Sequence, residues 1–341
     1  MRDRRKAPSQ LEIAKAAGVS RTTVSFVLNN ARGKNIGEET RQKVIATAQA
    51  LGYSPDAAAV STATSRDGAV GLFVCHSESV FSDAYIMRLL EGMGPVFNKG
   101  RLDLRVRQFS MARSDYAEIA AKDGYLGVIL INLHEDDPGI SRLASSGLPF
   151  VVVGSLPDRE VTQVDIDNVE AARKAAEHLL SLGHRDVAVV AHADPAFIAV
   201  HDRLAGFLGA FEAAGAALPS ERLKFAGFTV ASGHAAALSL LSYGTPPTAI
   251  FATNDMVAYG VLEALEEVGL HVPRDVSVVG FDDDYFSRYT NPPLTTVTLP
   301  AEGIGRIAAE VLLRVVAGGG TERVRLPVSL TIRRSSAQVG S

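Results

Sequence analysis

The stretch LEIAKAAGVSRTTVSFVLN, residues 11–29, has the pattern of two short helices joined by a tight turn. Ser9 and Glu12 form a capping box, which predicts that the first helix begins there. Gly18 permits the left-handed conformation that often ends a helix, and Ser20 can cap the second helix. The residues expected to face inward are Leu11, Ile13, Ala14, Ala17, Val24, Val27 and Leu28. Two helices joined in this way form a helix-turn-helix, whose second helix enters the major groove of DNA.

A third helix is predicted from Glu38 to Leu51. Its first residues, Glu38 and Glu39, suit the positive end of the helix dipole, and Gly52 follows its last residue. We therefore expect an all-α head at residues 1–54.

The charge of the chain is unevenly divided. Its 341 residues carry a formal net charge of −4. Residues 1–68 hold 11 Lys and Arg against six Asp and Glu, whereas the other residues hold 23 against 32. A basic head on an acidic body is typical of a polyanion-binding module attached to a second function. A flexible basic tail would have the same charge but would lack the helical pattern of residues 11–29.

The composition and motifs disfavour several other classes of protein. No apolar run approaches 18 residues and none follows the basic N-terminus, so we expect no membrane span and no signal peptide. Cys75 is the one cysteine, which excludes an internal disulfide or a cysteine metal cluster and fits the cytoplasm. Because nucleophile elbows, phosphate-binding glycine loops and metal-ligand spacings are absent, we expect neither an enzyme nor a cofactor.

The motifs of the head resemble those of the LacI/GalR family of transcriptional regulators. Besides residues 11–29, the resemblance rests on EETR at residues 38–41 and LGYSP at residues 51–55. It implies a sequence-specific DNA-binding regulator, with repression as the leading interpretation. Because each chain has one head, which covers a half-site, we expect a homodimer on an inverted-repeat operator.

The resemblance places the second helix of the head against DNA bases. Arg21 and Thr22 open this helix, and arginine can donate two hydrogen bonds to guanine. Phe26, one turn later, can make only apolar contact, for example with a thymine methyl group. The residues expected to contact phosphates are Thr23, Ser25, Asn29, Thr40 and Tyr53.

Residues 55–68 form the predicted linker. By resemblance, residues 55–63 match a hinge helix that forms on operator DNA and inserts a leucine into the minor groove. Thr62 occupies the leucine position and is followed by Ala63, and threonine is a poor wedge between bases. The alanines of this segment favour a helix. A plain flexible linker is the alternative.

After residue 68, apolar runs alternate with amphipathic helical patterns, which predicts parallel sheets covered by helices on both faces. The expected strands are 69–75, 104–109, 127–131, 150–153, 187–191, 223–226, 249–252 and 276–280. The expected helices are 85–97, 114–121, 140–146, 169–182, 203–214, 232–242 and 256–268. The two series imply an α/β body at residues 69–341 with two Rossmann-like subdomains and a ligand site between them.

This body resembles the type I periplasmic-binding-protein fold of the same family, in which the chain crosses three times between subdomains. We expect the crossings near residues 160, 291 and 320. The expected N-subdomain comprises about 69–160 and 292–320, and the expected C-subdomain about 161–291 and 321–341. No heptad repeat follows, so we expect the assembly to stop at the dimer.

Polar residues that follow the strands are the candidate ligands of a small-molecule effector. By resemblance they comprise Asp83, Tyr85, Arg203, Phe228, Asn254 and Asp282. Arg203 can hold two neighbouring oxygens, Phe228 can stack on a ring, and Asn254 and Asp282 can bind hydroxyl groups. This set suits a hydroxylated ring with one apolar side.

Two positions depart from the sugar-binding pattern of the family. Gly154 and Leu299 stand where Asp and Gln are common, which predicts a cleft less polar than that of typical sugar sensors. A ligand larger or more apolar than a monosaccharide, or a nucleoside, is therefore left open.

Plainer interpretations exist for several polar residues. Asp255 can cap the helix that follows it, and Arg203 can form a surface salt bridge. We interpret Asp283 and Asp284 as solvated loop acids without a metal, because no histidine accompanies them. His184 is expected to be structural.

The leading hypothesis is thus a repressor whose operator affinity depends on an effector. A small-molecule receptor for transport is the second hypothesis, disfavoured by the basic head and the expected lack of a signal peptide. An enzyme is disfavoured by its missing motifs. A regulator that has lost its effector is a variant of the leading hypothesis.

Overall fold

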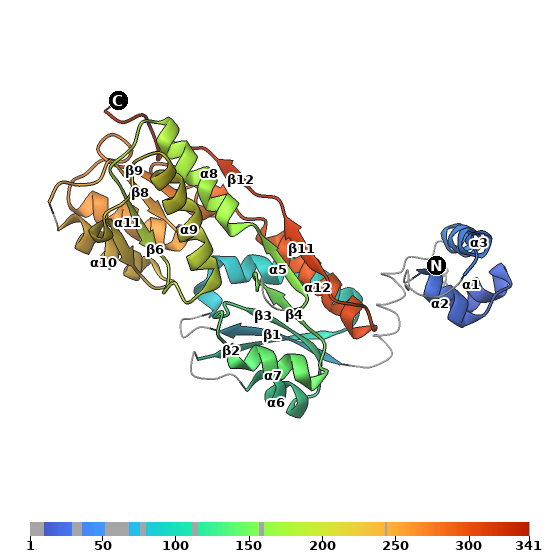
Figure 1. The fold of residues 1–341 in the computed structure, drawn as a ribbon. Coiled ribbons are helices and arrows are strands. Elements are labelled where there is room, and N and C mark those ends of the chain that lie inside the picture. The colour runs from blue at the N-terminus through green and yellow to red at the C-terminus, as the bar shows by residue number, and fades with distance from the viewer. Residues whose placement is uncertain are drawn as a thin grey trace, which may run out of the picture.

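Three short helices form the N-terminal head in the computed structural model, which describes residues 10–28, 36–51, 68–75, 80–110, 115–156, 160–242 and 244–340 (Figure 1). They are α1 (Gln10–Ala17), α2 (Arg21–Leu28) and α3 (Glu38–Ala50). Gly18 has the predicted left-handed conformation, with φ +68°, and the amide of Thr23 donates to Ser20 Oγ at 3.0 Å. The buried core of the head consists of Ile13, Ala14, Ala17, Val24, Val27, Val44 and Ala48.

One residue of the predicted apolar stripe faces solvent. Leu11 is 53% exposed because it lies in the first turn of α1, beyond the small core made with α2 and α3. The predicted cap Ser9, the predicted contacts Asn29, Tyr53 and Thr62, and the hinge helix lie outside the described residues.

The first lobe of the body is a six-stranded parallel sheet in the order β11-β5-β4-β3-β1-β2. The strands are β1 (Ala69–Cys75), β2 (Asp103–Phe109), β3 (Tyr125–Ile131), β4 (Phe150–Val153), β5 (Gln163–Ile166) and β11 (Arg323–Leu326). Helices α5 (Ala84–Lys99) and α12 (Ala301–Val316) cover one face, and α6 (Tyr116–Lys122) and α7 (Pro138–Ser146) cover the other (Figure 1).

Strand β1 is apolar and buried at every position, so it is covered on both faces of the sheet. Val70, Leu72 and Val74 pack in the core that includes α5 and α12, whereas Phe73 and Cys75 pack in the core of α6 and α7. This alternation is what a strand buried on both sides requires.

The second lobe repeats the design with a sheet in the order β12-β10-β9-β8-β6-β7. Its strands are β6 (Val187–Ala191), β7 (Leu223–Phe225), β8 (Ala249–Ala252), β9 (Ser277–Asp282), β10 (Thr295–Thr298) and the antiparallel β12 (Ser329–Thr331). Its helices are α8 (Asn168–Ser181), α9 (Ile198–Ala213), α10 (Val230–Leu241) and α11 (Asp255–Glu267). One-turn 3-10 helices occupy Val80–Ser82 and Ser220–Arg222.

The three crossings between the lobes lie later in the chain than residues 160, 291 and 320. β5 and β11 pair with each other in the first sheet, and β10 pairs with β9 and β12 in the second. The chain therefore changes lobe near residues 167, 299 and 327. The cause is that QVDI of β5 and TTVT of β10 have no long apolar run, so the sequence pattern does not mark them as strands.

Helices α5 and α12, from opposite ends of the body sequence, are in close contact through glycine. A Cβ atom at Gly92 would lie 1.9 Å from the carbonyl oxygen of Glu302, and one at Gly305 would lie 2.1 Å from that of Leu89. Only glycine at these positions allows the two backbones to approach so closely. Among the described residues, no helix is long and apolar enough to cross a membrane.

Candidate functional site

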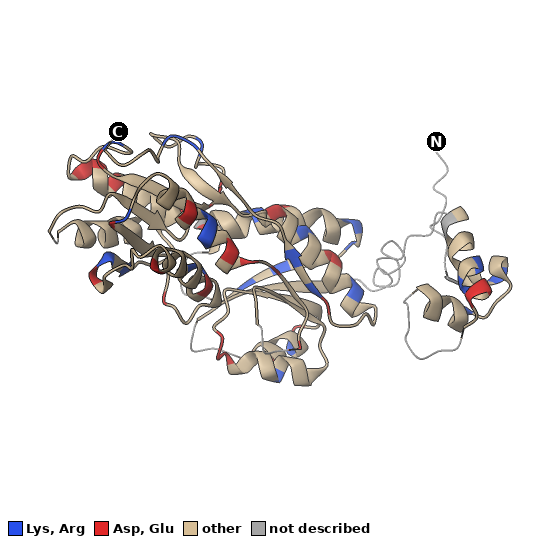
Figure 2. Ribbon diagram, turned by 45° about the horizontal axis from the view of Figure 1, so that its top comes forward, with Lys and Arg blue, Asp and Glu red and all other residues tan. Residues whose placement is uncertain are grey.

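The exposed face of α2 carries the residues predicted to meet DNA. Arg21 and Thr22, at the start of α2, are exposed, whereas Thr23, Ser25 and Phe26 are half-buried. Val24 and Val27 anchor the opposite face of α2 in the core of the head. The described basic residues of the head lie on its helices (Figure 2): Lys15, Arg21, Arg41 and Lys43. A helix held in this way can present a forked cation and a hydroxyl group to a DNA groove.

A cavity between the two lobes is lined by all the residues predicted to hold an effector, namely Asp83, Tyr85, Arg203, Phe228, Asn254 and Asp282. Gly154 and Leu299 also line it. Asp282 is the last residue of β9, and Asn254 follows β8 by two residues. The carboxyl ends of parallel strands meet at one edge of a sheet, which is why these side chains converge.

Arg203 is 6% exposed and is fixed on several sides within this cavity. Its Nε donates to Asn168 Oδ1 at 3.0 Å, and Nη1 donates to the carbonyl of Thr253 at 2.6 Å. The guanidinium carbon lies 3.7 Å from the centre of the Phe281 ring, and Nη1 lies 3.6 Å from Asp282 Oδ1. Arg203 is therefore a buried residue of the cavity and does not form the surface salt bridge that was the alternative.

Asp83 and Asn254 each cap a helix as well as lining the cavity. Asp83 Oδ1 accepts from the amide of Tyr85 at 2.9 Å, at the start of α5. Asn254 Oδ1 accepts from the amide of Val257 at 2.8 Å, so Asn254, and not Asp255, is the N-cap of α11. Because these bonds fix the side chains, both residues present a rigid polar group to the cavity.

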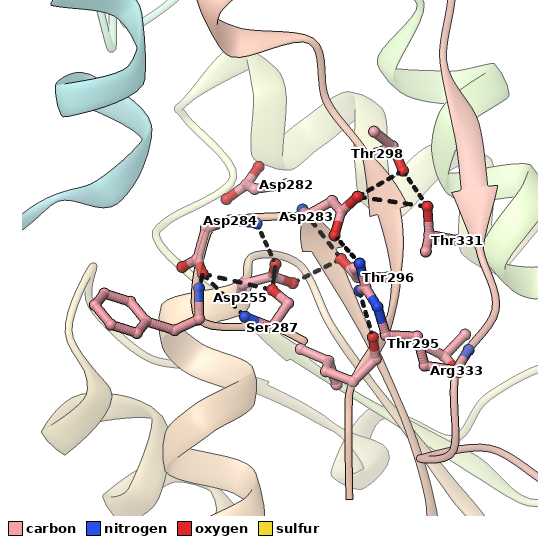
Figure 3. Close-up of polar contacts among 12 residues, drawn as sticks. Asp255, Asp282, Asp283, Asp284, Ser287, Thr295, Thr296, Thr298, Thr331 and Arg333 are labelled. Carbon is pink, nitrogen blue, oxygen red and sulfur yellow. Dashed lines mark hydrogen bonds and ion pairs between the residues drawn. The ribbon is translucent and has the colours of Figure 1, made fainter. Parts of the chain in front are cut away.

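Asp255 is instead the centre of a buried network behind the cavity (Figure 3). Its Oδ1 accepts from Thr296 Oγ1 at 2.7 Å, and its Oδ2 accepts from the amide of Asp284 at 3.0 Å and from the hydroxyl of Ser287. Asp284 is 1% exposed and accepts from the hydroxyl of Tyr259. The network thus ties the turn after β9 to α11 and β10.

Asp283 is bound on the other side of the same turn (Figure 3). Its carboxylate pairs with Arg333 and accepts from Thr298 Oγ1 at 3.1 Å. The prediction that Asp283 and Asp284 are solvated loop acids is therefore wrong, because β10 and the C-terminal segment engage Asp283, while contacts with α11 bury Asp284. Asp282 and Asp283 have φ of +117° and +51°, and the network holds this unusual backbone in place.

Burial shifts the pKa of the ionisable groups in the cavity. Burial raises the pKa of Asp83 to about 6 and that of Asp165 to about 7, and it raises the pKa of Asp282 well above its usual range despite the nearby charge of Arg203. Burial, followed by the positive charge of Arg203, holds the pKa of His192 well below its usual value. His192 is therefore neutral near pH 7.

Four polar residues of the cavity were not singled out in the sequence: Asn132, Asp165, Asn168 and His192. Asn132 and His192 directly follow β3 and β6, so the search for polar groups after strands could have found them. Asn168 bridges two charged groups, since its Nδ2 donates to Asp165 Oδ2 at 3.1 Å while its Oδ1 accepts from Arg203. The cavity is therefore more polar than Gly154 and Leu299 alone suggest.

Aromatic rings form one wall of the cavity. Phe228 meets Phe197 edge to face, with ring centres 5.4 Å apart, and meets His192 in the same way at 5.3 Å. Leu133 and Ile198 also line the cavity. One side of a ring-shaped ligand can therefore pack on apolar atoms while its other groups reach the polar residues.

Comparisons with known proteins agree with this architecture. The family model described as bacterial regulatory proteins, lacI family, matches residues 11–56, and the periplasmic binding protein-like domain matches residues 176–336. The HTH-type transcriptional regulator CelR of Thermobifida fusca is 34% identical to this chain, covering 98% of it and 99% of the relative. The probable HTH-type transcriptional repressor ExuR of Bacillus subtilis is 31% identical, covering 92% and 93%.

The chain belongs to the LacI family of transcriptional regulators. A solved structure of a CelR–cellobiose complex is 30% identical to it and superposes with a TM-score of 0.73, covering 96% of this chain and 99% of that one. This LacI-family protein is a DNA-binding transcriptional regulator with a helix-turn-helix head and a two-lobed α/β body, and it is not an enzyme.

Other residues of this LacI-family chain have structural roles. His184 is buried and contacts Thr248 Oγ1 and the carbonyl of Ala337, each at 3.0 Å, as expected of a structural histidine. Cys75 is buried against Tyr116. Within the described ranges, no group of three or more His, Cys, Asp and Glu could hold a metal ion.

Arg88 joins the two lobes of the LacI-family body beside the cavity between them. It lies on α5 of the first lobe, and its Nη1 donates to the carbonyls of Asp282 and Asp283 at 3.0 and 2.9 Å. Its Nη2 donates to the carbonyl of Leu299 at 3.4 Å, at one of the crossings. Arg88 was not predicted from the sequence, because its partners are backbone atoms that are 194 or more residues away.

Proposed function

We propose that this LacI-family regulator binds an inverted-repeat operator as a homodimer and represses transcription there. We also propose that a small, sugar-like effector in the cavity between the lobes changes its affinity for the operator. The observation that carries the proposal is the convergence of Arg203, Asp282, Asn254 and Phe228 on one cavity formed by both lobes. A ligand held by both lobes binds one arrangement of them better than another, which shifts the population.

In the head, Arg21 and Thr22 contact base edges, Phe26 makes apolar contact, and Thr23, Ser25 and Thr40 contact phosphates. The exposure of Arg21 and Thr22 at the start of α2 supports these roles. The cellobiose complex of the similar CelR protein supports a carbohydrate as effector. Asn254, Asp282 and Arg203 offer the acceptors and the forked donor that vicinal hydroxyl groups need.

Selection of bound duplexes from a random pool by the full chain tests the operator. We expect an inverted repeat, bound by two chains with an affinity that falls steeply with salt. Arg21→Ala should relax the base preference at one position of each half-site by about 1–3 kcal/mol, whereas Lys43→Ala should weaken binding to all sequences alike. Binding of a single chain to an unrepeated half-site would contradict the proposal.

Asp282→Asn tests the effector site. Asparagine has nearly the same shape and tolerates the positive φ, so the variant removes the charge and keeps the turn. We expect the dissociation constant for whichever mono- or disaccharide binds the wild type to rise at least about tenfold, because a carboxyl group that can ionise on binding is replaced by a neutral amide. Operator affinity without sugar should change less than about twofold. Glu266→Gln, which alters an exposed acid on α11, is the matched control. An unchanged sugar response in Asp282→Asn would refute the assignment.

A further inference from the structure

Carboxyl groups outnumber cationic groups in the lining of the cavity. Three carboxylates, those of Asp83, Asp165 and Asp282, line it, and Arg203 is the one cationic side chain among its described lining residues. His192 adds no positive charge, because its pKa is held well below its usual value. Burial raises the pKa of all three carboxyl groups, and a bound cation would favour their ionised forms.

Arg203 supplies a single positive charge for the three carboxyl groups. Its Nε and Nη1 donate to neutral oxygens of Asn168 and Thr253, and its plane rests on Phe281. Its contact with Asp282 is 3.6 Å, too long for a hydrogen bond. The guanidinium is thus oriented mainly by neutral partners, and its charge faces several carboxylates at once.

The carboxylates keep acceptor atoms available to a ligand. The side chain of Asp282 is 10% exposed and forms no hydrogen bond to another described residue. Figure 3 shows it apart from the network that engages Asp283 and Asp284. The two hydrogen bonds to Asp83 both go to Oδ1, at the start of α5, which leaves Oδ2 for the cavity.

All three carboxyl groups act electrostatically on one side chain of the cavity. After burial itself, the negative charges of Asp165, Asp282 and Asp83 all raise the pKa of the Tyr85 hydroxyl, while Arg203 lowers it. Tyr85 lines the same cavity. A positive charge bound near the Tyr85 hydroxyl would therefore be attracted by all three carboxylates.

We propose that the effector of this regulator carries a cationic amino group on a hydroxylated ring, as an amino sugar does. This inference rests on the proposed function and specifies the class of its ligand. An ammonium group donates three hydrogen bonds and stabilises the ionised carboxylates, whereas a neutral sugar donates hydrogen bonds without adding a positive charge. A sugar acid would add a further negative charge to the cavity.

Matched pairs of sugars test the proposal by isothermal titration of the full chain at about pH 7, where the amino groups of the probes are largely protonated. The pairs are glucosamine with glucose, galactosamine with galactose, and the β-1,4-linked dimer of glucosamine with cellobiose. N-acetylglucosamine is the neutral probe that keeps the nitrogen and its bulk. In a pair that binds, we expect the amino member to have a dissociation constant at least about tenfold lower than its neutral partner.

Asp165→Asn tests whether the carboxylate of Asp165 causes the preference for an amino sugar over its neutral partner. It removes one carboxylate while Asn168 can still donate to the new amide oxygen. We expect the dissociation constant of the neutral sugar, divided by that of its amino partner, to fall toward one. Asp136→Asn alters an exposed acid of the same lobe and should leave this ratio unchanged.

Two results would overturn the inference, and only the second of them would also overturn the proposed sugar-like effector. If neutral sugars bind as tightly as their amino partners or more tightly, the inference is wrong and the effector site stands. If no member of any pair binds or alters operator affinity, the inference and the sugar-like effector fail together.

Discussion

At the residue scale, Asp282, which we propose binds the effector, lowers the stability of the body in two ways. A carboxylate that is 10% exposed, without a hydrogen bond to another described side chain or amide, loses much of its hydration on folding. Its backbone also adopts a φ of +117°, which few residues other than glycine adopt. The contacts of Asp255, Asp283 and Asp284 offset these costs by fixing the turn from both sides. The residue is thus preorganised to meet a ligand.

Asp165 allows a measurement of how much a buried, ionised carboxylate destabilises the folded protein. Its pKa rises from 3.8 to about 7 on folding, mainly through burial, so folding favours the protonated carboxyl. The stability that this group contributes is complete below about pH 4 and is lost as the pH rises through about 7. Asp165→Asn does not titrate. We therefore expect its melting temperature, without ligand, to match that of the wild type near pH 4 and to exceed it by about 2–4 °C at pH 8.

Differential scanning calorimetry across this pH range measures the effect. Asp136→Asn, with its carboxylate exposed, should follow the wild type at every pH. A difference between wild type and Asp165→Asn that does not depend on pH would mean that the carboxylate of Asp165 is not destabilised by burial.

Some residues of the site could be predicted from the sequence and others could not, and the difference has physical reasons. Asp282 ends β9 and Asn254 follows β8, and because apolar runs mark both strands clearly, the convergence of these two residues could be predicted. Asp165 lies inside the short strand QVDI, where no local pattern indicates a cavity. Arg88 donates only to backbone carbonyls that are distant in the sequence. Every residue has such a carbonyl, so the residue types do not indicate these partners. Asp255 has the position of a helix cap, but contacts from β10 give it a different role.

At the element scale, the pairing of α5 with α12 depends on two glycines. Gly92 faces the backbone of α12, and Gly305 faces that of α5, with hypothetical Cβ atoms at 1.9 and 2.1 Å from carbonyl oxygens. Backbone atoms cannot move aside as a flexible side chain can, so an added methyl group must separate the helices. Because α12 also packs on β3 and β4, such a separation would disturb the first lobe.

Gly305→Ala should therefore destabilise the body by about 1–3 kcal/mol, in spite of the higher helix propensity of alanine. Gly94→Ala is the matched control in the same pair of helices, because nothing lies within 4 Å of the added Cβ. We expect Gly94→Ala to stabilise α5 by about 0.5–1 kcal/mol. Urea unfolding of both variants gives the comparison, and a neutral or stabilising Gly305→Ala would show that the helices can move apart at little cost.

Elements with strong local signals were the predictable ones. The strands 69–75, 187–191 and 249–252 are apolar throughout, and the structure has them at these bounds. β10, with three threonines in TTVT, has no such run and was missed. Helix α12 was also missed, although its apolar residues have helical spacing. The strand order could not be predicted in detail, because β5 and β11 pair across more than 150 residues.

At the scale of the whole molecule, Arg88 connects the lobes at the point where an effector would bind. Its three hydrogen bonds run from α5 of the first lobe to the end of β9 and to the crossing at Leu299. A charged donor bonded to carbonyls contributes about 1.5–3 kcal/mol. The bonds exist only when the lobes have this relative position, so Arg88 stabilises this arrangement over others.

Arg88→Met retains most of the side-chain volume and removes all three bonds. We expect a loss of about 1.5–3 kcal/mol in the free energy of unfolding. Arg306→Met, which removes an exposed pair with Glu310 within α12, should cost less than about 1 kcal/mol. Chemical denaturation of the two variants without ligand measures the contrast. Equal, small losses would mean that the bonds of Arg88 are replaced by water without cost.

The three crossings near residues 167, 299 and 327 also determine what happens when the chain is cut. Neither lobe is a continuous piece of sequence, so no truncation can isolate one of them intact. A protease that severs the segment at Pro327 leaves the lobes joined by the other two crossings and by an apolar core that includes both Val70 and Val187. The nicked protein would therefore keep its mass and shape on a sizing column, and the two fragments would separate only in denaturant.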